Sequence, residues 1–401
     1  MTTTPSLRSA ASPAAGRPTA EPATGPTAVA PAPRLRVAFL TLYDASTASS
    51  RIRAYQFAPA LALHGIDVTF FPLLTGDTKR WLTRLAAARN PLALFRALSP
   101  LAVRAPLRAL QVIRSWSFDA VLVQKDVLPL GLASLLFLGQ KRVIFDFDDP
   151  IWLPNPSAGG KLSAGRFLTR YRMRLLDAMI ARSRVVLVDN ELLRNHAKRL
   201  TRDCRVVCSP IDTRAYAPRG PLTGTEKVLG WIGSPATAYL LHAMLPALER
   251  LAARFPLRLL NVGGPELKSK HFAIENIAWS EDAERAALSR MHAGLAPSDE
   301  SPFNLHRFNY KVVIYFAGGV PPLAAGVGLN REMVADGVNG VLYDPHNTDD
   351  LMEKAARMLT DTRWNEALSK AARAEAERTY DVRVLAGTLV EAIRSARGGV
   401  E

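Results

Sequence analysis

Short runs of apolar residues, each followed by a polar or glycine-rich loop and then by a helical pattern, recur along the chain. The first run is LRVAFLTLY, at 35–43, and the first helical pattern, at 54–65, ends at a glycine. Strands buried on both faces of a parallel sheet read as continuous apolar runs, so this alternation predicts parallel strands joined by crossover helices. Further runs in the first half lie at 67–74, 120–124, 142–149 and 185–190.

The same pattern restarts at residue 227 and predicts a second α/β unit. Its apolar runs lie at 227–234, 257–264, 293–298 and 320–325, and its helical patterns at 237–254, 349–359 and 383–397. The fold class we expect is α/β, with two doubly wound Rossmann-like domains. We place the first domain at 34–212, a linker rich in Pro, Gly and Thr at 213–226, the second domain at 227–380, and a C-terminal helix at 381–401 that can pack on either domain.

Composition narrows the class of protein. Residues 1–33 contain seven prolines, nine alanines and no aromatic residue, which predicts a disordered tail without the apolar core of a signal peptide. No run of eighteen apolar residues predicts a membrane span. The two cysteines, Cys204 and Cys208, have no partner set for a metal or for a disulfide framework, so we expect a cytoplasmic protein without metal or cofactor.

Ligands of open α/β sheets bind at the carboxyl ends of the strands, which directs attention to four loops of the second half. They are GSPAT, GGPELKSK, PSDESPFNLHRFNYK and AAGVGLNRE. Their glycines permit close backbone approach, and the helix that follows each loop offers free N–H groups to an anion. A glycine after one strand is most often plain turn chemistry, but four such loops together favour an anionic ligand.

Residues 317–345, AGGVPPLAAGVGLNREMVADGVNGVLYDP, resemble the donor-site segment of GT-B glycosyltransferases of family 4, the glycosyl transferases group 1. The resemblance extends to 229–251 and 277–298, and in the first half to 49–73 and 142–152. It implies the GT-B fold, in which two Rossmann-like domains face a cleft, and a nucleotide-sugar donor. The donor-binding residues that it implies are Gly233, Ser234, Arg307, Asn309, Lys311, Asn330 and Glu332.

This sequence departs from the family pattern at two places. The family often carries two glutamates eight positions apart, and those places hold His306 and Ile314 here. An isoleucine cannot accept the hydrogen bonds of ribose hydroxyls. Many relatives also place Arg and Lys after the first donor-domain strand, and this chain has neither between Gly233 and Leu241. Phosphate is then expected to meet backbone N–H groups, Lys311, or a loop of the first half that contributes Ser50, Arg51 and Arg53.

An acidic loop, DFDD, follows a predicted strand of the first half and carries Asp146, Asp148 and Asp149. Carboxylates so close repel one another, and one is expected to have a raised pKa. A metal site, a helix N-cap and an acceptor site are the alternatives. We favour an acceptor site in which Asp146 is the first candidate for taking the proton of the acceptor hydroxyl. If the reaction retains configuration, as in most of the resembled family, the donor phosphate is the base and these aspartates orient sugars.

The net charge of +15 is unevenly distributed. Residues 78–118 contain no acid, and their eight cations, interleaved with Trp81, Phe95 and Trp116, are Lys79, Arg80, Arg84, Arg89, Arg96, Arg104, Arg108 and Arg114. Such a stretch is typical of a segment that binds an anionic membrane surface, and the alternative is a pair of helices with solvated arginines. No nucleic-acid-binding motif accompanies the charge, so nucleic acid is not an expected partner.

The function that fits these features best is transfer of a sugar from a nucleotide-sugar donor to a saccharide or lipid-linked acceptor in cell-envelope polysaccharide synthesis, at the inner membrane face. The missing glutamate pair motivates a second hypothesis, a non-catalytic GT-B protein that binds a glycan or a membrane. A nicotinamide-dependent oxidoreductase is a weaker third, because neither strand-to-helix loop contains GxGxxG.

Overall fold

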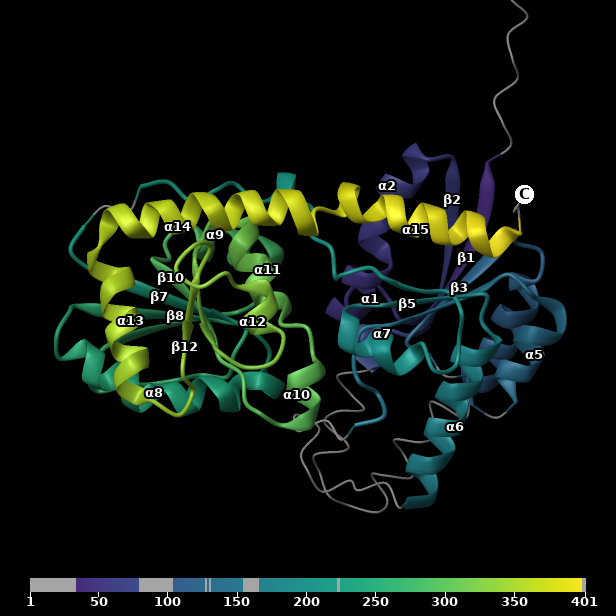
Figure 1. Cartoon of the computed structure of the whole chain (residues 1–401), viewed down its shortest axis with the longest axis horizontal. Coiled ribbons are helices and arrows are strands. Elements are labelled where there is room, and N and C mark those ends of the chain that lie inside the picture. Colours follow the sequence, from purple (N-terminus) through teal and green to yellow (C-terminus); the bar gives the residue numbers. More distant parts are fainter. Residues whose placement is uncertain are drawn as a thin grey trace, which may run out of the picture. The chain divides into compact units, whose positions relative to one another are not determined.

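The computed structural model describes residues 34–78, 104–126, 128–129, 131–153, 166–221 and 224–398. Within them, two six-stranded parallel sheets are each flanked by helices (Figure 1). This confirms the prediction of two Rossmann-like α/β units.

The first sheet has the strand order β2-β1-β3-β4-β5-β6, with every neighbouring pair parallel. Its strands are β1 (Leu35–Tyr43), β2 (Ile66–Leu74), β3 (Ala120–Gln124), β4 (Val143–Phe147), β5 (Val185–Val188) and β6 (Cys204–Val206). The five apolar runs predicted the first five strands. The short edge strand β6 was not predicted, because its residues are only half-buried and form no apolar run.

The second sheet has the order β12-β11-β10-β7-β8-β9 and is also parallel throughout. Its strands are β7 (Lys227–Ile232), β8 (Leu257–Val262), β9 (Ala273–Ile277), β10 (Ala293–Ala296), β11 (Pro322–Ala325) and β12 (Val341–Tyr343). The edge strand β9 was missed in the sequence, since two adjacent polar residues interrupt AIENI and none of its residues is buried.

Helices cover both faces of the first sheet. One face packs against residues 104–115, which are helical, and against α5 (Leu132–Gly139), α6 (Arg166–Arg182) and α7 (Glu191–Ala197). The other face packs against α2 (Ala58–Leu63), which follows α1 (Ala48–Arg53), and against α15 (Val382–Arg397). The C-terminal helix, which could have packed on either unit, therefore completes the core of the first sheet (Figure 1).

The second sheet is covered in the same manner. On one face lie α8 (Ala238–Ala252) and α13 (Thr348–Thr360), and on the other lie α9 (Glu281–Leu288), α11 (Tyr310–Ala317) and α14 (Thr362–Glu375). The short helices α10 (Pro302–His306) and α12 (Asn330–Met333) lie in loops at the carboxyl edge of this sheet. Side-chain caps start several of these helices: Ser280 accepts the N–H of Ala283 in α9, and Asn347 accepts two N–H groups in α13.

The basic stretch is described only in part, and that part corrects the picture of a solvated basic face. Arg108 is fully buried, donates to the carbonyls of Phe71 and Thr41, and pairs with Asp126 at 3.2 Å. Arg104 donates to the carbonyl of Leu73. These arginines hold the helix to the sheet. The cations from Lys79 to Arg96 lie outside the described residues.

Candidate active site at the carboxyl edges of the sheets

Lys311 lies where the first turn of α11 meets the end of β7. Its Nζ is 5.0 Å from the ring centroid of Trp231, which is fully buried. A Cβ added to Gly233 would lie 2.4 Å from the same ring, so the indole of Trp231 contacts both Lys311 and the loop that contains Gly233. Asn309 precedes α11 without capping it through its side chain. A lysine beside an uncapped helix N-terminus is suited to a phosphate group.

The electrostatics of Lys311 favour the same ligand. Burial, and to a smaller extent the positive charge of Arg307, lowers the pKa of Lys311 to about 7. Among the described residues, no carboxylate forms an ion pair with this ammonium, and its partner is the indole of Trp231. A bound anion would therefore favour the protonated, positively charged form of Lys311, which the protein alone stabilises poorly.

Of the other residues expected around the donor, two are exposed and one is buried and hydrogen-bonded within the protein. Ser234 and Glu332 are exposed, and the side chain of Glu332 forms no hydrogen bond or ion pair with the described residues. Asn330 is buried: its amide donates to the carbonyl of Ala325 at 2.9 Å, and its oxygen accepts the amide of Asn309 at 3.0 Å. Asn330 therefore ties the donor loop to the start of α11, and its amide is not free for a ligand.

A buried ion-pair network lies under the loop after β1 in the first unit. Arg53 donates through Nε to Asp146 at 3.3 Å and through Nη1 to Asp189 at 3.1 Å, and all three side chains are at most 2% exposed. Ser209 donates to Asp189 at 3.1 Å. Burial raises the pKa of Asp146, although Arg53 opposes the shift, and burial raises the pKa of Asp189 to about 7.

This network corrects two expectations about single residues. Asp146 was expected to face the acceptor, and Arg53 a phosphate. Both side chains point instead into the core, because Asp146 lies within β4 and Arg53 neutralises it there. Ser50 is also buried, and its hydroxyl donates to Gln124 at 2.8 Å.

Asp148 and Asp149 lie beyond the end of β4, and Lys125 pairs with both. Its Nζ is 3.0 Å from Asp148 and also contacts Asp149, while Arg307 lies 3.8 Å from Asp149. Burial opposes ionisation of Asp149, but Lys125 and then Arg307 outweigh it and hold its pKa below the ordinary value. The expected repulsion is thus relieved by a lysine that the sequence analysis missed. Lys125 adopts φ 60°, a left-handed conformation that is uncommon outside glycine.

Arg51 is the less buried of the two arginines of α1, with its side chain 19% exposed. Its guanidinium carbon is 4.7 Å from the ring centroid of Trp279, and its Nε is 3.4 Å from Glu281. Two positions along α1, Arg53 is buried, so the helix directs one arginine outward and the other inward.

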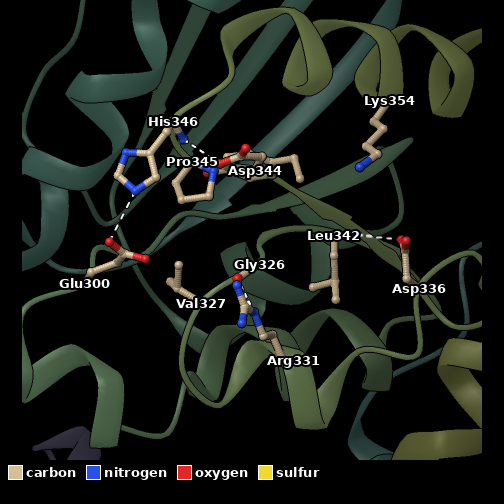
Figure 2. Close-up of a pocket in the computed structure, with 11 residues that line it drawn as sticks. Glu300, Gly326, Val327, Arg331, Asp336, Leu342, Asp344, Pro345, His346 and Lys354 are labelled. Atoms are coloured by element: carbon tan, nitrogen blue, oxygen red, sulfur yellow. Dashed lines mark hydrogen bonds and ion pairs between the residues drawn. The ribbon is translucent and has the colours of Figure 1, made fainter.

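A separate pocket of about 550 Å³ lies at the ends of β11 and β12 (Figure 2). Its charged lining is Glu300, Arg331, Asp336, Asp344, His346 and Lys354. Three of these charges have close partners: His346 lies 3.2 Å from Glu300, Arg331 donates to the carbonyl of Gly326, and Lys354 pairs with Asp350 at 2.8 Å. Lys311 and Gly233 are not part of this lining.

The two positions of the family's glutamate pair have different surroundings. Ile314 is 7% exposed and belongs to the apolar core under α11, while the ring of His306 contacts the carbonyl of Pro302 at 2.8 Å. Ile314 therefore brings no carboxylate to the place where relatives often have one. In the described part of the chain, no three His, Cys, Asp or Glu side chains gather to hold a metal ion. No helix of that part is long and apolar enough to cross a bilayer.

Comparison with known families gives this geometry its context. Residues 226–361, which contain β7 to β12, Lys311 and the donor loop, match the family model for glycosyl transferases group 1. This segment is a glycosyl transferases group 1 domain. Over 56 residues, or 14% of the chain, the sequence is 46% identical to D-inositol 3-phosphate glycosyltransferase of Nocardiopsis dassonvillei. The matched stretch spans only 13% of that relative's length.

Solved structures extend the likeness to both α/β units. Sucrose-phosphate synthase of Thermosynechococcus elongatus superposes with a TM-score of 0.63 and 14% identity, over 90% of this chain and 98% of that one. HepE of Anabaena, in complex with UDP, superposes with a TM-score of 0.62 and 15% identity, over 90% of this chain and 100% of that one. At such identities the likeness shows the fold, which is the two-domain GT-B arrangement.

Proposed function

We propose that the chain is a glycosyltransferase that moves a sugar from a nucleotide-sugar donor to a saccharide or lipid-linked acceptor in cell-envelope polysaccharide synthesis. The observation that carries the proposal is Lys311, a half-buried ammonium without a carboxylate partner in the described residues, at the N-terminus of α11 and beside the Gly233 loop. A diphosphate would supply the missing negative charge. The group 1 match over 226–361 supports the proposal, as does HepE, a similar structure that binds UDP.

The donor would lie along the carboxyl edge of the second sheet. Lys311, the free N–H groups at the start of α11, and the backbone of Gly233 and Ser234 would bind the diphosphate. The carboxylate of Glu332, which is exposed and has no side-chain partner among the described residues, would accept hydrogen bonds from hydroxyl groups of the donor sugar.

We propose a retaining transfer, because the first sheet offers no free carboxylate at Asp146 to act as a base. The acceptor oxygen would bond to the anomeric carbon as the bond from that carbon to the phosphate oxygen breaks. The departing phosphate would take the proton of the acceptor hydroxyl. Asp148 and Asp149, paired with Lys125, would orient acceptor hydroxyls.

A non-catalytic GT-B protein is the second candidate, and Ile314 is the observation that favours it. Its buried alkyl side chain stands where relatives often hold ribose, so donor affinity would rest on fewer polar contacts.

Incubation of the full chain with UDP-, GDP- and ADP-sugars separates these candidates. We expect slow release of nucleotide from at least one donor and faster release with a saccharide acceptor. Binding without release from any donor would support the non-catalytic candidate. Absence of both binding and release would contradict the glycosyltransferase proposal.

A lipid-linked acceptor is supported by one face of the helix at 104–115. Leu107, Leu110 and Ile113 follow at intervals of three residues and are 43%, 54% and 45% exposed. Arg114 is exposed on the same helix. Apolar side chains beside cations are typical of a face that lies on an anionic membrane. We therefore propose that the enzyme acts at the cytoplasmic face of the inner membrane.

Sedimentation with liposomes tests this membrane face. Binding should rise with the fraction of anionic lipid, fall with salt, and weaken when Leu107 and Leu110 are both changed to Asn. Leu63→Asn is the matched control, because Leu63 is 85% exposed on α2, which covers the opposite face of the same sheet. Equal binding of all three proteins would assign these leucines to another contact.

A further inference from the structure

The pocket at the ends of β11 and β12 has hydrogen-bonding groups that the proposed transfer does not use. Its volume of about 550 Å³ lies in the range of small-molecule sites. Its polar side chains come from separate segments of the second unit: Glu300 follows β10, Arg331 belongs to α12, Asp336 precedes β12, and His346 follows it (Figure 2). The fold therefore gathers these groups around one space.

Three exposed carboxylates of this pocket are each held through one oxygen. Asp336 accepts the N–H of Leu342 through Oδ1 at 2.8 Å, and Asp344 accepts the N–H of His346 through Oδ1 at 2.9 Å. Oε2 of Glu300 lies 3.2 Å from Nε2 of His346. The second oxygen of each carboxylate has no hydrogen-bond partner among the described residues. These contacts restrain the carboxylates and leave one acceptor oxygen of each available to a ligand.

The cations of the pocket supply fewer free groups than the carboxylates do. Arg331 donates through Nε to the carbonyl of Gly326, and in the described part of the chain its two terminal nitrogens have no partner. Lys354 is already paired with Asp350 at 2.8 Å. Three carboxylates thus surround one guanidinium that has no carboxylate partner among the described residues. This excess of negative charge disfavours an anionic ligand, whereas hydroxyl groups can donate to carboxylates and accept from a guanidinium.

We propose that this pocket binds a neutral sugar unit, whose hydroxyl groups donate to the three carboxylates and accept from Arg331. Val327 and Pro345 also line the pocket and offer apolar contacts to the C–H groups of a sugar ring. The site is separate from that of Lys311: β11 and β7 are two positions apart in the sheet, a spacing of about 10 Å. The inference goes beyond the proposed function, because binding here requires no transfer and concerns a sugar other than the one transferred.

Saturation-transfer NMR on the full chain tests the pocket, with glucose and galactose as probes and each compared with its uronate. At least one neutral sugar should bind more tightly than its uronate. Asp336→Asn combined with Asp344→Asn keeps an acceptor oxygen for each backbone bond, and this double variant should bind the sugar about tenfold or more weakly. Asp349→Asn is the matched control, because Asp349 is an exposed acid of α13 that pairs with Arg250 outside the pocket.

Calorimetry with UDP, GDP and ADP separates this inference from the proposed function. The double variant should bind these nucleotides as the wild type does, because Lys311 is not part of the pocket. The inference is overturned if the wild type binds neither sugar, if the double variant binds the sugar as tightly as the wild type, or if the uronates bind more tightly than the neutral sugars. A wild type that binds a sugar in this pocket but no nucleotide would contradict the proposed function and leave the inference standing.

Discussion

The depressed pKa of Lys311 predicts that nucleotide binding takes up a proton. In the free protein, burial and the charge of Arg307 lower this pKa to about 7, so the ammonium is half-deprotonated at neutral pH. A bound diphosphate favours the charged form and raises the pKa. Affinity should therefore be highest near pH 7 and should fall as the pH rises, because the lysine must be protonated before the phosphate can use its charge.

The size of the effect follows from the fraction of protein that carries the ammonium. With a free pKa of about 7, that fraction is about one half at pH 7 and about 1% at pH 9. The dissociation constant of a nucleoside diphosphate should then rise about 50-fold between these pH values, or about 2.3 kcal/mol. The terminal phosphate, whose second pKa is near 6, stays ionised throughout and contributes little to the change.

Calorimetry at pH 7, 8 and 9, in buffers of different ionisation enthalpy, measures both the affinity and the number of protons taken up. Lys311→Arg should bind with little pH dependence, since a guanidinium stays charged across this range. Lys311→Met should bind the nucleoside diphosphate weakly, and its affinity should also show little dependence on pH. A flat profile in the wild type, or the wild-type slope persisting in Lys311→Met, would refute the assignment of Lys311 to the phosphate site.

Two further predictions concern stability. Because burial raises the pKa of Asp189 to about 7, above its value in the unfolded chain, the free energy of unfolding should fall as the pH rises from about 4 to 7; urea denaturation should show this fall and its reduction in Asp189→Asn. Gly294→Ala should cost about 1 to 3 kcal/mol, because the new Cβ would lie 2.5 Å from the ring of Tyr315, whose hydroxyl is hydrogen-bonded to Ile232 and Leu295. The control Gly387→Ala, with nothing within 4 Å of its Cβ, should not destabilise; equal denaturation midpoints for the two alanine variants would contradict the packing argument.

The apolar pattern predicted the central strands well because burial on both faces leaves little choice of residue. β1 and β7 read as continuous apolar runs for this reason. The edge strands β6 and β9 have one side toward solvent, and their residues are partly exposed. Their pairing depends on the neighbouring strand and not on their own hydrophobicity, so the sequence carried no strong signal for them.

The roles of single polar residues were harder to predict than the sheets. Arg53 contacts Asp146 and Asp189, which lie 93 and 136 positions away along the chain. No local pattern encodes such a contact. Asp146 does carry one usable signal, since it lies inside the apolar run VIFDF and not after it, which indicates a strand position facing the core. Its neighbours Asp148 and Asp149 follow that run and are correspondingly less buried.

The two arginines of α1 show how the buried network and the surface site depend on each other. Among the described residues, Arg53 is the cation that pairs with both Asp146 and Asp189, and its loss would leave two carboxylates buried without an ion-pair partner. That pairing fixes the C-terminal end of α1 against β4 and β5, and thereby fixes the position from which Arg51 reaches Trp279. A buried ion pair contributes little net stability by itself, so its value here is positional. Arg53 therefore holds α1 in place, and Arg51 contacts Trp279 and Glu281 from that position.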